Sequence, residues 1–318
     1  MTQSGGSGFV QSVQDRLRNA AKESGRPFAE LLELFAVERF LHRLGRSRQR
    51  DRFVLKGALL LRQWLGADTR PTRDIDLLGP VDLDEGALQE ALEELLRVGV
   101  EHDGISFDIG SIVIRPLRAE MAVHGLRAKF DAHLGRTRLR YQIDVGLGDA
   151  VFPPAVQVIP GGLLGLPVAS VRAYTPYTTV AEKLEAMVVL GEANSRTKDY
   201  YDLYQIPRLV AFDGPMLVES IRRTFARRAT NIPAEPLEGL RDTFARGPLH
   251  ATRWRAFLAK GLLRVAETEF LGVVACIRRF AQPVLEAGRD DRPFDQHWPP
   301  NGPWQTKEDA RPGALSAR

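Results

Sequence analysis

Hydrophobic positions recur at helical spacing near the start of the chain, over residues 9–44, and Gly25-Arg26-Pro27 interrupts them. Apolar residues three and four apart line one face of a helix, so this stretch predicts two helices joined by a turn. The apolar stripe over residues 53–65 predicts a third helix, which ends near Gly66.

The middle of the chain alternates between apolar and polar residues, which is typical of strands with one buried face. Residues 75–78 predict a short strand, and residues 85–98 predict an amphipathic helix. Further strand-like stretches follow at residues 105–109, 111–114, 126–132 and 139–145. This order predicts a largely antiparallel sheet with a helix crossing over it.

After a Pro/Gly-rich linker over residues 152–167, the pattern becomes helical at residues 178–190, 197–203, 215–226 and 253–280. The predicted fold class is α+β, with a mixed or antiparallel sheet, helices around it and a helical C-terminal lobe. We expect N-terminal helices over 1–50, the sheet-containing core over 51–170, the helical lobe over 171–285, and an irregular or disordered tail over 286–318.

The 318 residues carry a formal net charge of +4 and a single cysteine, so no disulfide within the chain is expected. The N-terminus lacks the basic start and apolar stretch of a signal peptide, which predicts a cytoplasmic protein without membrane contact. Arginines cluster within residues 43–52, 136–140 and 222–228. Guanidinium groups suit phosphate, so these clusters predict a polyanionic partner, with solvated surface runs as the alternative.

Two aspartates stand two residues apart on the predicted strand, in Thr72-Arg73-Asp74-Ile75-Asp76. Alternate residues of a strand share one face, so the carboxylates of Asp74 and Asp76 project together. Magnesium takes a few carboxylates and keeps its other positions for water and phosphates, as a nucleotide-transfer site requires. The alternative is a solvated strand edge whose acids pair with Arg70 and Arg73.

A further acid, Asp144, lies in Tyr141-Gln142-Ile143-Asp144-Val145, where an unpaired carboxylate among apolar residues would be costly. A nearby metal would remove that cost, so the predicted metal ligands are Asp74, Asp76 and Asp144. Such a trio could coordinate two ions, one activating an attacking hydroxyl and one neutralising a triphosphate. The predicted ion is Mg²⁺, with Mn²⁺ as the alternative, and this chemistry needs no protein nucleophile.

Several segments, in order along the chain, together form a set of motifs that one protein family shares. The opening motif is carried by Leu55-Lys56-Gly57 and Arg70-Pro71-Thr72-Arg73-Asp74-Ile75-Asp76. Later motifs are similar in His124-Gly125-Leu126-Arg127, Gln142-Ile143-Asp144-Val145-Gly146 with Gly148-Asp149, Ala181-Glu182-Lys183-Leu184, Arg196-Thr197-Lys198-Asp199-Tyr200-Tyr201-Asp202-Leu203, and Thr224-Phe225 with Arg228. One departure is Ala58, where nucleotidyltransferases usually have glycine or serine. In these motifs the chain resembles the AbiEii/AbiGii family of nucleotidyltransferase toxins, and the resemblance implies a polymerase-beta-like nucleotidyltransferase core.

The resemblance also implies roles for residues beyond the metal ligands. The catalytic residues that it implies are Asp74, Asp76, Lys183 and Asp199. The nucleotide-binding residues that it implies are Lys56, Gly57, Arg70, Thr72, Lys183, Arg196 and Lys198. From its helix, whose other face is apolar, Lys183 is expected to present a free ammonium to a triphosphate, with an ion pair as the alternative.

In function, the resemblance implies the toxin of a bacterial toxin–antitoxin pair, with a cognate, AbiEi-like, DNA-binding antitoxin as partner. It further implies transfer of a nucleotide from a nucleoside triphosphate substrate to an acceptor. The leading acceptor is the 3′ end of transfer RNA, where addition would block aminoacylation, and the arginine clusters agree with an RNA substrate. Two alternatives stay open: nucleotidylation of a protein, and a non-catalytic binding module on the same fold.

Overall fold

The computed structural model describes residues 4–66, 69–70, 72, 74–117, 125–159, 162–261, 263 and 265–306. The chain divides into two compact units. Unit 1 comprises residues 1–63, 71–148 and 156–173, and unit 2 comprises residues 64–70, 149–155 and 174–318. No helix among the described residues has both the length and the hydropathy needed to cross a membrane.

The core of unit 1 is a mixed sheet, in which seven strands of the described chain run in the order β3-β4-β5-β2-β1-β7-β6. The pairs β2/β5 and β1/β7 are parallel, and the other described neighbours are antiparallel. The strands are β1 (Val54–Lys56), β2 (Ile75–Gly79), β3 (Ile105–Pro116), β4 (Gly125–Leu134), β5 (Thr137–Leu147), β6 (Val156–Val158) and β7 (Val171–Ala173). The sheet confirms the predicted α+β class.

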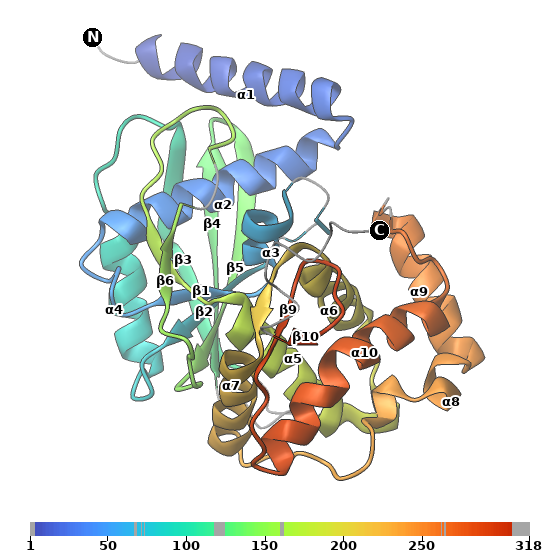
Figure 1. The fold of residues 1–318 in the computed structure, drawn as a ribbon. Coiled ribbons are helices and arrows are strands. Elements are labelled where there is room, and N and C mark those ends of the chain that lie inside the picture. The colour runs from blue at the N-terminus through green and yellow to red at the C-terminus, as the bar shows by residue number, and fades with distance from the viewer. Residues whose placement is uncertain are drawn as a thin grey trace, which may run out of the picture. The chain divides into compact units, whose positions relative to one another are not determined.

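Helices of unit 1 cover one face of this sheet, except that the N-terminal helix packs on the second helix (Figure 1). They are α1 (Ser4–Ser24), α2 (Phe28–Arg46) and α4 (Glu85–Leu96), and α3 (Ala58–Leu65) begins in the same unit. On α2, the ring of Phe40 lies with its centroid 6.2 Å from those of Phe130 on β4 and Tyr141 on β5. The Tyr141 hydroxyl also donates to the carbonyl of Ala36 at 2.6 Å. The hydrophobic core therefore lies between α2 and the sheet.

The opposite face of the sheet is polar because the strands alternate. On β5, Tyr141 and Ile143 are buried, whereas Arg140 is exposed and Asp144 is partly exposed. Successive side chains of a strand point to opposite faces, so the charged residues of β5 lie on the face that α2 does not cover. This arrangement keeps the predicted metal ligand Asp144 out of the core.

Unit 2 is mainly helical. Its helices are α5 (Pro176–Leu190), α6 (Thr197–Leu209), α7 (Gly214–Arg227), α8 (Asp242–Ala245), α9 (Pro248–Gly261) and α10 (Phe270–Arg289), with short 3₁₀ turns at Gly191–Ala193 and Glu238–Leu240. Local sequence explains where two of them begin. Pro176 stands in the first turn of α5, and the Asp213 carboxylate before α7 accepts from the backbone N–H of Met216 at 3.0 Å.

Two predicted helices differ from those observed. Residues 53–57 do not continue into α3 as a helix, because Val54 and Lys56 pair with β2 as the strand β1. A short buried strand followed at once by a helix forms one apolar run, which periodicity alone cannot divide. The single helix predicted over residues 253–280 is two helices, α9 and α10, and residues 265–269 between them are not helical.

The prediction of an irregular tail over 286–318 is wrong for the residues up to 306. Helix α10 continues to Arg289, and the strands β9 (Gln296–Trp298) and β10 (Gln305–Thr306) form a small sheet with β8 (Phe212–Asp213). Trp298 is only 3% exposed, and its indole donates to the carbonyl of Pro207 at 2.7 Å. Two scattered tryptophans thus anchor this segment, since Trp304 also stacks on Phe280 with centroids 5.7 Å apart. Residues 307–318 lie outside the described chain.

Candidate active site

The two aspartates of the Asp-x-Asp pair lie at the start of β2 in unit 1. Asp76 is partly exposed between the buried residues Ile75 and Leu77, and Asp74 is exposed just before the strand. The Asp74 carboxylate accepts a hydrogen bond from the Gln142 amide at 3.3 Å. Burial of the alternate residues therefore fixes the strand, while the carboxylates stay accessible on its polar side.

Strand register places four charged residues in one row across the sheet. Asp76 is the direct neighbour of Lys56 on β1 and of Asp144 on β5. Asp144 is in turn the direct neighbour of Arg127 on β4. Directly opposed residues of adjacent strands point to the same face. We call Lys56, Asp76, Asp144 and Arg127 the charged row: it sets two carboxylates side by side, with a cation on either side of them.

The turn between β1 and α3 holds the backbone against Asp76. Gly57 has a φ of +74°, and a Cβ built on it would stand 1.9 Å from Oδ2 of Asp76. Glycine is needed here both for the left-handed backbone and for the close approach. Helix α3 begins at Ala58, so a helix N-terminus, which favours anions, follows the turn directly. Thr72, the other residue predicted to bind nucleotide nearby, is partly exposed before β2.

Asp144 forms a two-point ion pair with Arg127. The guanidinium donates from Nε to Oδ1 and from Nη2 to Oδ2, both at 2.7 Å. The hydrogen bonds to Asp144 raise the pKa of Arg127, and the charges of Asp74 and Asp76 act in the same direction. The buried-carboxylate cost that suggested Asp144 as a metal ligand is therefore met by an arginine in this structure.

The donor set on β2 fits a hard divalent cation. Asp76 on β2 lies beside Asp144, and Asp74 just before the strand accepts from Gln142 two residues away on β5, so both carboxylates lie on the polar side of the sheet. This arrangement suits magnesium because it keeps several waters and substrate phosphates among its ligands. Among the residues that the structure describes, no group of three or more His, Cys, Asp or Glu side chains is placed to hold a metal ion. The residues present fit a site at which the protein supplies two carboxylates and the substrate supplies further oxygens.

A buried network of ion pairs joins α5, α6 and the segment 64–70 in unit 2. The Lys183 ammonium lies 2.5 Å from Oδ1 of Asp199 and 2.7 Å from Oδ2 of Asp202. Arg70 binds Asp202 at two points, Nε to Oδ1 at 2.8 Å and Nη2 to Oδ2 at 2.9 Å. The Asp202 side chain is fully buried, and that of Arg70 is 8% exposed. We call Arg70, Lys183, Asp199 and Asp202 the buried network.

The buried network corrects one expectation, which concerns Lys183. Lys183 does not present a free ammonium, because it pairs with carboxylates of α6. The alternative prediction, an ion pair, is therefore the one observed. Asp202 is the more deeply buried of the two aspartates and pairs with both cations, whereas the catalytic role of Asp199 stays a prediction. Arg70 is buried rather than solvated, and it pairs with Asp202, which is distant in sequence.

Charge pairing outweighs burial in this network. Burial alone would lower the pKa of Lys183, but the carboxylates of Asp199 and Asp202 raise it overall. Burial would likewise raise the pKa of Asp202, but Lys183 and Arg70 lower it overall. Lys183 and Asp202 therefore stay charged at neutral pH, and their pairing forms a fixed electrostatic scaffold rather than a proton donor or acceptor.

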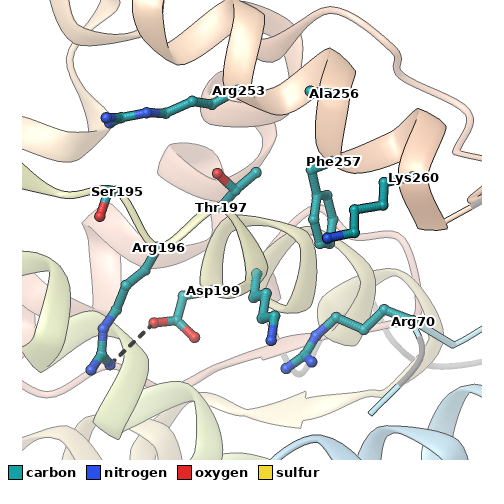
Figure 2. A pocket seen from close by; sticks show the side chains of 10 residues that line it. Arg70, Ser195, Arg196, Thr197, Asp199, Arg253, Ala256, Phe257 and Lys260 are labelled. Atoms are coloured by element: carbon teal, nitrogen blue, oxygen red, sulfur yellow. Dashed lines mark ion pairs between the residues drawn. The ribbon is translucent and has the colours of Figure 1, made fainter.

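A basic pocket of ≈ 610 Å³ opens next to the buried network, within unit 2. Figure 2 shows its side chains, with Arg196 directed at Asp199, which it pairs with at 3.6 Å. The two residues stand three positions apart, a spacing at which side chains of a helix meet. The pocket is lined by Arg70, Ser195, Arg196, Thr197, Lys198, Asp199, Arg253, Ala256, Phe257 and Lys260. The predicted nucleotide-binding residues Arg70, Arg196 and Lys198 thus share one pocket with a predicted catalytic residue, Asp199.

Helix α9 contributes lining residues that the sequence had not singled out. Arg253, Phe257 and Lys260 stand four and three positions apart, so they share one helix face, which borders the basic pocket. Lys198, Arg253 and Lys260 are exposed and make no ion pair with any described residue. The signal was the i, i+4, i+7 spacing of cation, aromatic and cation, which resembles an ordinary solvated helix face until its neighbours are known.

The arginine clusters are largely engaged in ion pairs. Arg228 is nearly buried and binds Asp149, Glu182 and Glu185 at 3.1, 3.1 and 2.8 Å. Burial would lower the pKa of Arg228, but these carboxylates raise it overall. Arg43 is buried against Asp103 at 2.6 Å. These arginines stabilise the fold, so sequence clustering overstated the basic surface.

The comparisons with known proteins point to one family. The model of the family described as nucleotidyl transferase AbiEii toxin, type IV toxin–antitoxin system, matches residues 39–275. This range contains the charged row, the buried network and α9. A search of curated proteins finds no match.

Solved structures are similar at low sequence identity. MenT4, a nucleotidyltransferase toxin from Mycobacterium tuberculosis H37Rv, is 20% identical, with a TM-score of 0.48 over 87% of this chain and 99% of that chain. JHP933 from Helicobacter pylori is 13% identical, with a TM-score of 0.41 over 79% of this chain and 90% of that chain.

Proposed function

The chain belongs to the AbiEii family of nucleotidyl transferase toxins of type IV toxin–antitoxin systems, and on that premise we propose that it transfers a nucleoside monophosphate to the 3′ end of transfer RNA. As a member of this family it is a nucleotidyltransferase with a polymerase-beta-like core, it uses a nucleoside triphosphate, and it has a cognate antitoxin. We also propose which metal ion it uses, which acceptor it modifies, which residues act in the reaction and what kind of antitoxin it pairs with.

The charged row is the observation that carries the proposal. It places Asp76 beside Asp144, with Asp74 at the head of the same strand and the Gly57 backbone against Asp76. Asp74 and Asp76 would hold Mg²⁺, with Mn²⁺ as the alternative, and Asp144 would take part if Arg127 released it. When bound, the ion would neutralise the triphosphate and lower the pKa of the attacking hydroxyl.

The reaction requires positioning and charge stabilisation rather than a protein nucleophile. The oxygen of the acceptor's 3′-hydroxyl forms a bond to the α-phosphorus of the nucleoside triphosphate. The bond from that phosphorus to the oxygen bridging to the β-phosphate breaks, pyrophosphate leaves, and the hydroxyl proton passes to solvent. Lys56 and Arg127 flank the two central aspartates and keep their charge balanced before the substrate arrives.

The basic pocket of unit 2 is suited to phosphate groups. Lys198, Arg253 and Lys260 offer ammonium and guanidinium donors, and Phe257 offers an aromatic face on which a base can stack. The buried network supports the wall of this pocket, because Lys183 pairs with Asp199 and Asp199 pairs with Arg196. We propose that Lys183 and Asp199 serve activity by positioning this wall of the pocket.

Transfer RNA is the proposed acceptor, and the cytoplasm is therefore the proposed site of action. Addition to the 3′ end would block aminoacylation and hence translation. The proposed antitoxin is AbiEi-like and DNA-binding.

Label transfer tests this proposal. The purified protein and its Asp76→Ala variant are incubated with Mg²⁺, total bacterial RNA and each labelled nucleoside triphosphate, and RNA and protein products are resolved separately. Label on small RNA with wild type only is the expected result, and the nucleotide that gives it is identified in the same experiment. Asp82→Asn is the matched control, since this carboxylate is exposed in a turn of the same unit.

Other outcomes point to the alternatives. Label on a polypeptide would replace the RNA acceptor with a protein target. Toxicity that survives Asp76→Ala, without label on any product, would favour a non-catalytic binding module and contradict the proposal. Chelation of divalent ions should abolish transfer by the wild type, and added Mn²⁺ should restore it in part.

A further inference from the structure

A second pocket, of ≈ 750 Å³, lies within unit 1 on the polar face of β3, β4 and β5. Its lining includes four cations: Arg115 of β3, Arg127 and Lys129 of β4, and Arg140 of β5. Asp131 is the one acid among the described residues that line it. The pocket continues from the charged row, because Arg127 belongs to both.

The positive charge of this pocket is only partly neutralised by the protein. Asp131 is already paired with Arg138 at 2.5 Å, and Arg127 is paired with Asp144. By contrast, Arg115, Lys129 and Arg140 are exposed, and none of them forms an ion pair with a described residue. Exposed cations of one sign that gather in a concave surface raise the local concentration of an anionic ligand.

The cations are arranged in successive rows rather than in one cluster. Arg115 is opposite Arg127, in line with Asp144 and Asp76. Lys129 stands two residues further along β4, and Arg140 is opposite Asp131, two residues beyond that. Alternate residues of a strand are about 7 Å apart, so cations follow one another at about this interval away from the carboxylates. This interval is similar to that between successive phosphates of an extended nucleic-acid strand.

We infer that this pocket binds the phosphate backbone of the single-stranded end of an RNA acceptor, with Arg115, Lys129 and Arg140 as the contacting cations. The inference rests on the proposed function, because an RNA acceptor is part of it. Arg127 then marks the point where the strand meets the charged row, which receives the terminal hydroxyl. A triphosphate is compact and would need one cluster of cations, whereas a chain of phosphates fits rows of them.

The apolar part of the lining agrees with this ligand. Val113 is 49% exposed although it is a large hydrophobic residue on a sheet, and Leu117 lies in the same pocket. Single-stranded nucleic acid offers base surfaces beside its phosphates, so cations interleaved with apolar side chains match it better than they match a free anion.

The test measures RNA binding without nucleotide transfer. Full-length protein is titrated against 5′-labelled bulk transfer RNA by fluorescence anisotropy over a series of salt concentrations, with no nucleoside triphosphate present. The combined variant Arg115→Ala, Lys129→Ala, Arg140→Ala should reduce the slope of log affinity against log salt by about 2, since each lost phosphate contact on a single strand removes about 0.7. Its affinity near physiological salt should fall roughly tenfold or more.

Matched variants make the result specific. Arg136→Ala removes an exposed arginine of the hairpin between β4 and β5 that does not line the pocket, so slope and affinity should match the wild type. Lys129→Arg should retain the slope, and Lys129→Glu should weaken binding more than Lys129→Ala. Since these side chains are exposed, the single variants should unfold at the same temperature as the wild type. If the combined variant does not fold, the salt slopes of the single variants provide the test.

The outcomes separate this inference from the proposed function. An unchanged salt slope in the combined variant, while the wild type labels RNA, would overturn the inference alone. Absence of RNA labelling by the wild type, with a reduced slope in the variant, would overturn the proposed reaction and keep the RNA-binding surface. Unchanged RNA affinity together with lost antitoxin binding would assign the pocket to an acidic protein partner and overturn the inference.

Discussion

The carboxylate of Asp76 lies so close to the Gly57 backbone that a β-carbon at position 57 would stand 1.9 Å from Oδ2 and 2.6 Å from the carboxyl carbon. Both residues belong to unit 1, and their strands are hydrogen-bonded neighbours. The position of the proposed metal ligand is thus set by the absence of a side chain on the adjacent turn, in addition to its own strand.

Replacement of Gly57 by alanine should therefore displace Asp76. A shift of about 1 Å at a catalytic group costs on the order of 100-fold in rate, and label transfer should fall by about this factor. The left-handed backbone should add a loss of stability of about 1–2 kcal/mol. Gly25→Ala is the control, because Gly25 has a φ of +68° and open space around it. Gly25→Ala should lose similar stability and keep its activity. If both variants lost activity equally, backbone strain rather than displacement of Asp76 would explain the effect at Gly57.

Removal of the Arg127 guanidinium should tighten metal binding. In Arg127→Met the Asp144 carboxylate loses its partner and becomes available beside Asp76. Loss of this adjacent positive charge should improve Mn²⁺ affinity roughly tenfold, because its repulsion of the ion is removed and only a small part of that repulsion has to survive solvent screening. Electron paramagnetic resonance of free Mn²⁺, without RNA or nucleotide, measures this affinity. Asp144→Asn should weaken it, and an unchanged affinity in both variants would remove Asp144 from the metal site.

Loss of the Asp202 carboxylate should destabilise unit 2 strongly. Asp202→Ala leaves the buried cations Arg70 and Lys183 without a shared partner, and breaking a buried ion pair in this way costs about 3–5 kcal/mol. Urea unfolding followed by tryptophan fluorescence reports on this unit, because all the tryptophans of the chain belong to it. Asp242→Ala is the matched control, since its ion pair with Arg278 is exposed and should be worth about 1 kcal/mol or less.

The same carboxylate should contribute to acid denaturation. The pKa of Asp202 is lowered from its usual 3.8 in the folded protein, because Lys183 and Arg70 outweigh burial. Above 3.8 the group is ionised in both states, so its stabilising effect is fully present. As pH falls from there through the lower folded pKa, the unfolded chain binds the proton first and the stabilisation is lost. The stability difference between wild type and Asp202→Asn should therefore shrink as the pH falls below about 4, and a constant difference would contradict this.

Cations of α9 should contribute to nucleotide affinity. Arg253→Ala and Lys260→Ala each remove a charged donor from the lining of the basic pocket. A charge-assisted hydrogen bond is worth about 1.5–3 kcal/mol, so the Kd of the preferred nucleoside triphosphate should rise at least about tenfold in each variant. Isothermal titration calorimetry gives this Kd. Arg255→Ala, an exposed arginine of α9 outside the pocket lining, should bind as the wild type does.

Short-range patterns explain how much of unit 1 could be predicted. Alternation along β4 and β5 indicated both of these strands, and the spacing of Asp74 and Asp76 indicated a shared face. The partly exposed position of Asp144 was not predicted, because the sequence analysis placed this carboxylate in an apolar environment. The patterns that did indicate structure depend on residues within a few positions of one another. The start of β1 was missed for the same reason, because a buried strand of three residues has no alternation to reveal it.

Partner choice across elements could not be predicted. The pairing of Arg127 with Asp144 depends on strand register, and that of Lys183 with Asp202 depends on how α5 packs on α6. A single sequence shows that these residues are charged but not which of them meet. The anchoring of residues 296–306 by Trp298 is likewise a tertiary effect, since local composition there is typical of an irregular tail.

The ion pair between Arg70 and Asp202 joins parts of the chain that are encoded far apart. Unit 2 takes Arg70 from the segment 64–70, which interrupts unit 1 in the sequence, whereas α5 to α10 all follow residue 174. A gene fragment that starts there would encode those helices and leave Asp202 short of one buried cation. Recombination that exchanges the second half of the gene between relatives would separate the two partners, so this arginine and this aspartate have to be inherited together.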